Sequence, residues 1–182
     1  MPRKLPPPPL TAQRLRDLAL HYTGRYATTE AKLRLYLIRK IRERGVAEGV
    51  ELDVATLASE CAELGYVNDA HYAESKAAGL GRKGLGRSRI KMTLKAAGIS
   101  DEISAPLLDL PEDEALRRAL TFAKRKRIGP YGSGGDDRKV NARWWGAMVR
   151  AGHAPDVIKH VMRFATAEEA DCPFLSSSNV NS

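Results

Sequence analysis

Three glycines that follow helical patterns recur at nearly equal intervals along this chain of 182 residues. Gly45, Gly98 and Gly152 are separated by 53 and then 54 residues. Glycine often ends an α-helix, because the left-handed backbone conformation that is needed there crowds any Cβ atom. The spacing therefore predicts one supersecondary unit that is repeated three times.

The residues before each glycine repeat the same apolar pattern. Four residues before the glycines stand Ile41, Leu94 and Met148, and eight residues before them stand Leu37, Ile90 and Trp144. Positions four apart lie on one face of a helix. The same amphipathic helix, with the same buried face, is therefore predicted three times.

Each glycine-ended helix has a predicted helix on either side. The preceding helices are predicted at residues 11–23, 68–78 and 111–127, and the following ones begin after each glycine, with an insertion at 47–53 in the first unit. Caps are predicted at Thr28, Asn68, Ser100 and Ala154–Pro155. No stretch of the sequence alternates apolar and polar residues as a strand would.

The predicted fold is all-α, an elongated tandem array of three three-helix-bundle repeats. The repeats are predicted at residues 10–65, 66–110 and 111–165, between a disordered Pro-rich N-terminus (1–9) and a disordered tail (166–182). A unit of about 50 residues is small for a core of its own, so neighbouring units are expected to pack on one another. The Gly- and Ser-rich segment 128–137 is typical of a flexible loop.

Composition and spacing exclude several classes of function. No apolar run approaches the roughly 20 residues that span a bilayer, and residues 1–10 lack the apolar stretch of a secretory signal, so we expect a cytoplasmic protein. Cys61, in an apolar helical pattern, and Cys172 are the only cysteines, and the four histidines are scattered. We therefore expect no metal, no cofactor and no catalytic residues.

Two motifs that resemble nucleotide-binding loops have simpler interpretations. The segment from Gly79 to Gly84 matches GxGxxG but follows a predicted helix instead of a strand, so we predict a hinge or a helix terminator. The glycines at 132–135 lack the Gly-Lys-Ser/Thr ending of a P-loop. Trp145 lies one step off the buried register of Trp144, and we favour packing over stacking on a base.

Basic residues are concentrated in two segments. The net charge is +8, and residues 75–100 and 115–135 contain seven and six basic residues with no acidic one. Arg87, Lys91 and Lys95 share a helix face away from Ile90 and Leu94. Unmixed charge favours an anionic partner. The predicted partner- or DNA-binding face comprises Arg82, Lys83, Arg87, Arg89, Lys91, Lys95, Lys124, Arg125, Lys126, Arg127, Arg138, Lys139 and Arg143.

The central block of the chain resembles a known family. Residues 65–74 read GYVNDAHYAE, a Gly-x-Gly turn follows at 84–86, and a basic helix ends in Gly98-Ile99. This block is similar to that of the RecX proteins, and Gly152 to Ile158 is similar to the start of their C-terminal helix. The resemblance extends over about residues 11–165. It implies tandem three-helix repeats without catalytic residues, which bind RecA, enter the groove of its filament on single-stranded DNA and restrain ATP hydrolysis and strand exchange in DNA repair and the SOS response.

Two functions of different classes stay open. The first is a monomeric regulatory protein that binds the RecA filament, with single-stranded DNA inside the filament as a further partner. The second is a helical DNA-binding regulator of the helix-turn-helix type, because three-helix units resemble that fold and the chain is basic. Binding to duplex DNA alone, with sequence preference, would favour the second. An enzyme is the third choice, because no nucleophile–base pair, metal set or carboxylate pair stands at a useful spacing.

Overall fold

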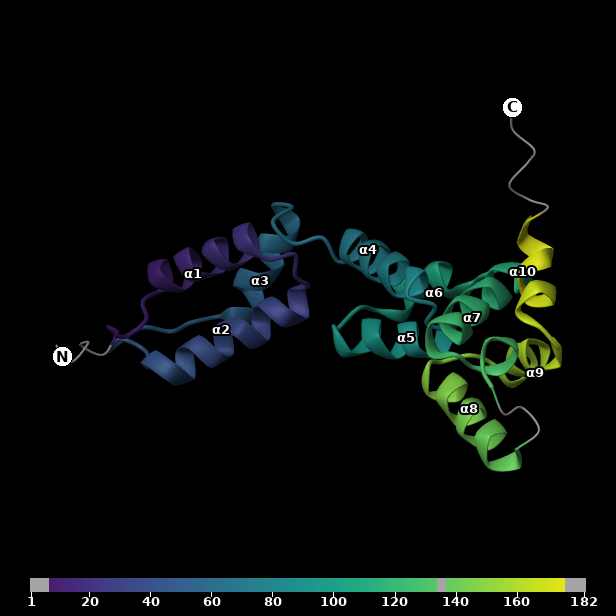
Figure 1. Cartoon of the computed structure of the whole chain (residues 1–182). Helices are drawn as coiled ribbons and strands as arrows, with labels where there is room; N and C mark the ends of the chain where they lie inside the picture. The colour runs from purple at the N-terminus through teal and green to yellow at the C-terminus, as the bar shows by residue number, and fades with distance from the viewer. Residues whose placement is uncertain (1–6, 134–136, 176–182) are drawn as a thin grey trace. The chain divides into compact units, whose positions relative to one another are not determined.

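The computed structural model of the protein describes residues 7–133 and 137–175, and its described secondary structure is helical (Figure 1). Ten α-helices and one short 3-10 helix occupy these residues. The described β pairing is an isolated parallel bridge between Leu10 and Val46. The predicted all-α fold is confirmed.

The helices follow one another in sets of three, as the repeat predicts. The first set is α1 (Ala12–Arg25), α2 (Glu30–Arg44) and α3 (Val54–Glu63). The second set is α4 (Asp69–Arg82), α5 (Arg87–Ala96) and α6 (Asp101–Leu108). The third set is α7 (Glu112–Lys126), α8 (Arg138–Arg150) and α9 (Pro155–Arg163), with the 3-10 helix η1 (Gly129–Tyr131) between α7 and α8. A further helix, α10 (Ala167–Leu175), follows.

The three repeated glycines follow the ends of their helices with positive φ angles, although the ψ of 173° at Gly45 lies outside the predicted αL region. Gly45, Gly98 and Gly152 have φ angles of 72°, 81° and 90°. Two of them are also closely packed. A Cβ atom on Gly98 would stand 2.2 Å from the Cβ of Ala31, and one on Gly152 would stand 2.3 Å from the backbone nitrogen of Arg89. These positions therefore need glycine for space as well as for conformation.

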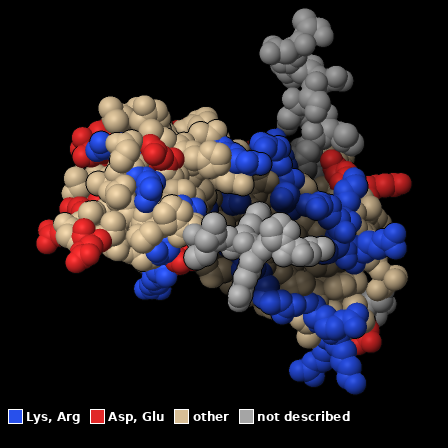
Figure 2. Space-filling view, turned by 90° about the vertical axis from the view of Figure 1, so that its left-hand side faces the viewer, with Lys and Arg blue, Asp and Glu red and all other residues tan. Residues whose placement is uncertain are grey.

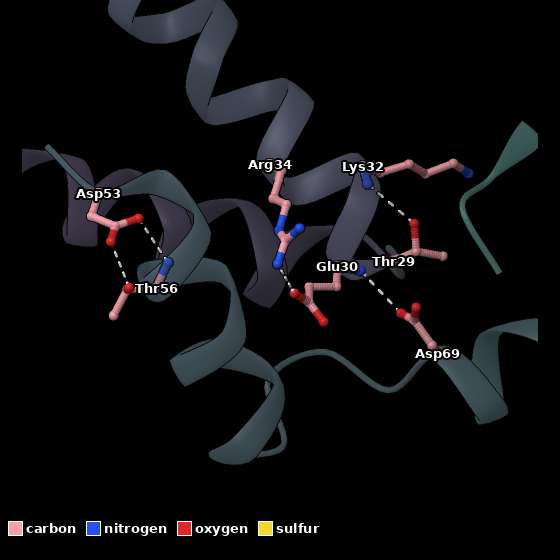
Figure 3. Close-up of polar contacts among 7 residues, drawn as sticks. All are labelled: Thr29, Glu30, Lys32, Arg34, Asp53, Thr56 and Asp69. Carbon is pink, nitrogen blue, oxygen red and sulfur yellow. Dashed lines mark hydrogen bonds and ion pairs between the residues drawn. The ribbon is translucent and has the colours of Figure 1, made fainter. Parts of the chain in front are cut away.

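The N-terminus of α2 is capped one residue later than predicted. The cap is Thr29 and not Thr28, because the Thr29 hydroxyl accepts a hydrogen bond from the backbone nitrogen of Lys32 at 3.2 Å. The same hydroxyl donates to the carbonyl oxygen of Ala97 at 2.5 Å. The carboxylate of Asp69 accepts from the backbone nitrogen of Glu30 at 3.0 Å (Figure 3). Two N–H groups in the first turn of α2, which have no partner within the helix, are thereby satisfied.

The other predicted caps are confirmed. The Asn68 side chain accepts from the backbone nitrogen of His71 at 2.8 Å, and the Ser100 hydroxyl accepts from that of Ile103 at 3.4 Å. Helix α9 begins with Pro155 directly after Ala154. An additional side-chain cap, Asp53, begins α3 after the 47–53 insertion (Figure 3).

The segment from Gly79 to Gly84 terminates a helix, as predicted, and is not a hinge. Helix α4 continues through Gly79 and Gly81 to Arg82, and Gly84, with a φ of 74°, follows its end. A Cβ on Gly81 would stand 2.9 Å from the guanidinium carbon of Arg118, so this glycine makes room for a side chain of α7. The predicted disordered tail is wrong for residues 167–175, which form α10 with Ala170 fully buried. The predictions for residues 1–6, 134–136 and 176–182 lie outside the described residues.

The chain divides into two compact units. Unit 1 comprises Met1–Ala73 with Ala96–Ile103, and unit 2 comprises Glu74–Lys95 with Ser104–Ser182. The predicted second repeat, residues 66–110, contributes to both units. The three repeat boundaries therefore stay a prediction.

Each unit has a hydrophobic core of its own. In unit 1, helices α1 to α3 bury Leu15, Leu33 and Leu37, and Cys61 is a small core residue as predicted, with 3% of its surface exposed. In unit 2, α7, α8 and α9 bury a second cluster, which includes Ala119, Leu120, Ala123, Met148, Ile158 and Val161. Trp144 and Trp145 are partly buried against this second core. Both indoles therefore pack within unit 2, and packing of Trp145 between repeats, the favoured interpretation, stays a prediction.

The described residues lack a membrane-spanning helix and a metal-binding cluster. Within residues 7–133 and 137–175, no helix is long and apolar enough to cross a membrane. In the same ranges, no three side chains of His, Cys, Asp or Glu are grouped so that they could hold a metal ion.

Candidate anionic-partner interface

All thirteen residues of the predicted basic face are exposed, and all of them belong to unit 2. They come from the end of α4, from α5, from the end of α7 and from the start of α8. The predicted repeats divide these basic residues between residues 66–110 and 111–165, whereas the structure places all of them in one compact unit. The structure therefore groups residues that are up to 61 positions apart in the sequence.

The two units differ in charge. Unit 2 contains 19 Lys and Arg against 11 Asp and Glu, whereas unit 1 contains 11 of each kind, so the whole net charge of +8 lies in unit 2. On the face drawn in Figure 2, Lys and Arg side chains gather into dense clusters over part of the surface. Such a concentration attracts polyanions and raises their rate of association.

Helix α5 is positioned by contacts between two backbone turns. The backbone nitrogen of Gly86 donates to the carbonyl of Ala151 at 2.9 Å, and that of Ser88 donates to the carbonyl of Gly152 at 3.2 Å. A Cβ on Gly86 would stand 2.3 Å from the Gly152 carbonyl oxygen. The Gly-x-Gly turn is thus required for the turn before α5 to pack against the turn after α8. We name Gly84, Gly86 and Gly152 the glycine contact.

A buried histidine strengthens the glycine contact. His153 has 7% of its surface exposed, and its Nε2 lies 3.0 Å from the carbonyl oxygen of Gly84. Its ring is tilted against that of Phe122, with 5.8 Å between the centroids. Burial lowers the pKa of His153 below its ordinary value of 6.5, although the hydrogen bond to Gly84 raises it. His153 is therefore a structural residue of unit 2.

The basic face of α5 is separated from its buried face as the sequence predicts. Ile90 and Leu94 are fully buried. Arg87, Lys91 and Lys95 are exposed, and they stand four residues apart. The buried residues fix the rotation of α5, and this rotation aims the three cations at solvent.

The end of α7 lies beside the turn that follows α4. The guanidinium of Arg125 donates to the carbonyl oxygen of Lys83 at 2.9 Å. This bond brings the α7 cluster, residues 124–127, next to Arg82 and Lys83. Two basic segments that are about 40 residues apart in the sequence therefore form one positive region.

Lys124 differs from the other residues of the α7 cluster because it has an acidic partner. Its ammonium lies 2.7 Å from the carboxylate of Asp171 in α10, which also accepts from the Tyr131 hydroxyl at 2.7 Å. The hydrogen bond from Lys124, followed by that from Tyr131, lowers the pKa of Asp171. This ion pair leaves Lys124 less available to a partner than its exposure suggests.

The basic residues of α8 are not brought next to the glycine contact. Arg138, Lys139 and Arg143 stand in the first two turns of α8, whereas the glycine contact lies just beyond its last residue, Arg150. A helix of 13 residues is about 20 Å long at 1.5 Å per residue. The predicted face therefore comprises a positive region at α4, α5 and α7 and a separate group at the start of α8.

An open groove beside α5 contains a cation that the sequence did not single out. The groove has a volume of about 680 Å³, and its lining includes Arg89 and Arg150 together with Met92 and Phe122. Met92 is 54% exposed and adds an apolar side chain to the open part of this groove. Arg150 was missed because it stands alone between apolar residues, outside the two unmixed basic segments.

Comparisons with known proteins identify relatives of this chain. Residues 68–105 match the family model described as "RecX, second three-helix domain". The chain is 31% identical over 172 residues to a protein of Myxococcus xanthus named "Regulatory protein RecX", and the match covers 88% of each chain. It is 28% identical over 160 residues to a protein of the same name from Agrobacterium fabrum, with 86% of this chain and 85% of the relative covered.

A solved structure has the same fold. The crystal structure of RecX from Lactobacillus salivarius matches 85% of this chain and 96% of its own, with a TM-score of 0.62 and 19% sequence identity. The identity to the Myxococcus protein over nearly the full length of both chains establishes the relationship. This chain belongs to the RecX family of regulatory proteins.

Proposed function

We propose that this protein binds the RecA recombinase and its filament on single-stranded DNA, and that it inhibits ATP hydrolysis and strand exchange. It would thereby modulate DNA repair and the SOS response in the cytoplasm. The observation that carries the proposal is the location of the whole net charge, and of all thirteen predicted contact residues, in unit 2 of a RecX-family chain. Because unit 2 is basic, the surface that it contacts is expected to be anionic. The negative charge is supplied by acidic side chains of RecA or by DNA phosphates.

The proposed mechanism is binding without catalysis. The glycine contact and His153 hold α5 in a fixed position, so its cations need little reorganisation when an anionic surface approaches. The family resemblance implies that RecA must adjust the interfaces between its subunits to exchange strands. A regulator that is bound along the filament restrains this change and slows ATP hydrolysis.

The test is a charge reversal on α5. The double variant Arg87→Glu, Lys91→Glu is expected to co-sediment with RecA filaments at least about tenfold more weakly, because it places negative charge against an anionic partner. Both side chains are exposed, so the circular dichroism spectrum should not change. Binding equal to that of the unaltered protein would remove α5 from the interface.

A matched control is available on α9 of the same unit. Lys159 and Arg163 are also exposed and four residues apart, and they lie outside the predicted face. The variant Lys159→Glu, Arg163→Glu changes the net charge by the same amount. It should bind filaments nearly as the unaltered protein does. An equal loss in both variants would show that only the net charge matters.

A second candidate function is a helix-turn-helix DNA-binding regulator. It is favoured by the tight turn between α4 and α5, followed by a helix that exposes Arg87, Lys91 and Lys95. This function requires sequence-dependent binding to duplex DNA in the absence of RecA. Equal, weak affinity for unrelated duplexes, together with tight binding to RecA filaments, would exclude it.

A further inference from the structure

Unit 1 contains a groove in which aromatic and basic side chains alternate. The groove lies between the end of α1 and the middle of α2 and has a volume of about 440 Å³. Its lining consists of three tyrosines, three cations and one histidine: Tyr22, Tyr26, Tyr36, Arg25, Arg39, Lys40 and His21. We name it the tyrosine groove. Unit 1 has no net charge, so this local collection is not a consequence of its composition.

Two of the three tyrosines form a rigid base for the groove. The rings of Tyr22 and Tyr36 are stacked, with 4.1 Å between centroids and 11° between planes. Both side chains pack against the core of unit 1. Packing against the core is therefore a sufficient reason for Tyr22 and Tyr36 to be aromatic.

The core does not explain the third tyrosine. Tyr26 is 53% exposed and does not belong to the group that packs against the core. Its ring lies 5.4 Å from that of Tyr22 at an angle of 48°. Its backbone is fixed, because its nitrogen donates to the Tyr22 carbonyl at the end of α1 at 3.0 Å. A large ring therefore extends from a fixed backbone position, contacts the Tyr22 ring, and has much of its surface open to solvent.

The cations surround the rings. The guanidinium carbon of Arg25 lies 6.0 Å from the Tyr26 ring centroid, and that of Arg39 lies 5.6 Å from the Tyr36 centroid. The ammonium of Lys40 lies 5.7 Å from the Tyr36 centroid. Glu43, outside the groove, pairs with Lys40 at 2.6 Å and with Arg39 at 3.6 Å. One carboxylate against three cations leaves the groove positive.

We propose that the tyrosine groove binds single-stranded nucleic acid. A base stacks on Tyr26, and neighbouring phosphates contact Arg25, Arg39 and Lys40. Exposed aromatic rings next to cations are the features that sequence-independent single-strand binding uses, because every base has a face that can stack. A duplex does not fit this role, since its base faces are covered by neighbouring pairs. The site lies in unit 1 and is distinct from the basic face of unit 2.

The experiment measures binding of a short fluorescein-labelled oligo(dT) by anisotropy, with the full chain and without RecA. The variant Tyr26→Ala is expected to weaken binding about five- to 100-fold, because stacking contributes about that factor per base. The variant Tyr26→Phe keeps the ring and should bind nearly as the unaltered protein does. Unaltered binding by Tyr26→Ala would overturn the proposal.

Tyr66 provides a matched control. It is an exposed tyrosine of unit 1, at 52% exposure, and it does not line the tyrosine groove. The variant Tyr66→Ala should bind oligo(dT) normally, and a loss equal to that of Tyr26→Ala would overturn the assignment. The variant Arg25→Gln should bind with a weaker salt dependence, because one phosphate contact is removed. The plot of log affinity against log salt concentration should therefore be less steep. An unchanged slope would exclude Arg25 from the site.

Photocrosslinking gives an independent test. An oligonucleotide that contains 5-iodouracil joins to aromatic side chains that stack on the base, and the joined residue is identified by mass spectrometry. We expect the crosslink at Tyr26. A crosslink only at Trp144 or Trp145 of unit 2 would overturn the proposal. Because RecA is absent from both experiments, their outcome is independent of the proposed inhibition of RecA.

Discussion

Gly98 is constrained by its neighbours as well as by its backbone. Its φ of 81° lies in the left-handed region, and a Cβ would stand 2.2 Å from the Cβ of Ala31 in α2. The Cβ of Ala31 is fixed to the helix backbone and cannot move aside as the end of a long side chain would. Two independent penalties therefore apply to any substitution here.

We expect Gly98→Ala to lower the free energy of unfolding by about 2 kcal/mol or more, from the left-handed backbone and from overpacking together. Chemical denaturation followed by circular dichroism measures this loss. Gly24→Ala is the matched control. Gly24 lies within α1, and a Cβ there meets no atom within 4 Å. That variant should be more stable by about 0.5–1 kcal/mol, because alanine favours the helix.

His153 makes the stability of unit 2 depend on pH. Because burial lowers its pKa in the folded protein, the unfolded chain binds the proton more readily. Stability is therefore fully present above the ordinary histidine pKa of 6.5 and is lost as the pH falls through 6.5 towards the lowered value.

We expect His153→Gln to remove part of the decrease in unfolding free energy between pH 7 and lower pH. His71 is exposed, and His71→Gln is the control variant. Denaturant midpoints measured across this pH range compare the three proteins. An identical pH profile for His153→Gln and the unaltered chain would contradict the burial-based account.

At the scale of elements, the start of α2 is held from two directions. The Thr29 hydroxyl bonds within α2 and also to the Ala97 carbonyl, beyond the end of α5, and Asp69 reaches the Glu30 nitrogen from the first turn of α4 (Figure 3). Thr29 is fully buried. Three segments of unit 1 that are distant in the sequence therefore meet at a single threonine.

We expect Thr29→Ala to lower the free energy of unfolding by about 2–3 kcal/mol, because the cap is lost and the buried Ala97 carbonyl loses its donor. Thr29→Ser keeps the hydroxyl and should cost less than about 1 kcal/mol. Thermal and denaturant unfolding of both variants provides the measurement. Similar losses for alanine and serine would mean that the threonine methyl group, and not the hydroxyl, is the stabilising part.

Periodicity predicts elements well where many apolar residues share a face. The helices that end at Gly45, Gly98 and Gly152 were predicted because each repeats its buried positions. Helix α10 was missed, because among its described side chains only Ala170 is buried and one small residue gives no periodic signal. The continuation of α4 through Gly79 and Gly81 was also missed. The close approach of Arg118 to Gly81, 37 residues away, likewise gives no signal in the local sequence.

The sequence predicted the thirteen basic residues of the candidate face but not their grouping. Their exposure and the i, i+4 spacing on α5 follow from helical periodicity. The bond from Arg125 to the Lys83 carbonyl, and the pairing of Lys124 with Asp171, depend on contacts between distant segments. The tyrosine groove has a local signal that was overlooked, since Tyr22 and Tyr26 stand four residues apart with Arg25 between them.

At the scale of the whole molecule, one chain carries two compact units, and each of them has a surface suited to an anionic partner. Two linked sites raise the effective concentration of the second contact once the first has formed. We therefore expect inhibition of DNA-dependent ATP hydrolysis by RecA at less than one copy of this protein per RecA subunit. Titration of the steady-state ATPase rate measures the ratio. A requirement for a full equivalent, in parallel with displacement of RecA from DNA, would contradict this expectation.

The glycine contact makes the number of residues in the turn before α5 decide which way the side chains of α5 face. The backbone of Gly86 and Ser88 is bonded to the carbonyls of Ala151 and Gly152, so the start of α5 cannot rotate. Each residue of a helix advances its azimuth by about 100°. One residue inserted after Ser88 would move Arg89 and Thr93 into the buried positions of Ile90 and Leu94, and would move Ile90 into the exposed position of Lys91. Substitution can therefore change the strength of the cationic stripe of α5, whereas its direction depends on the count of residues in the turn.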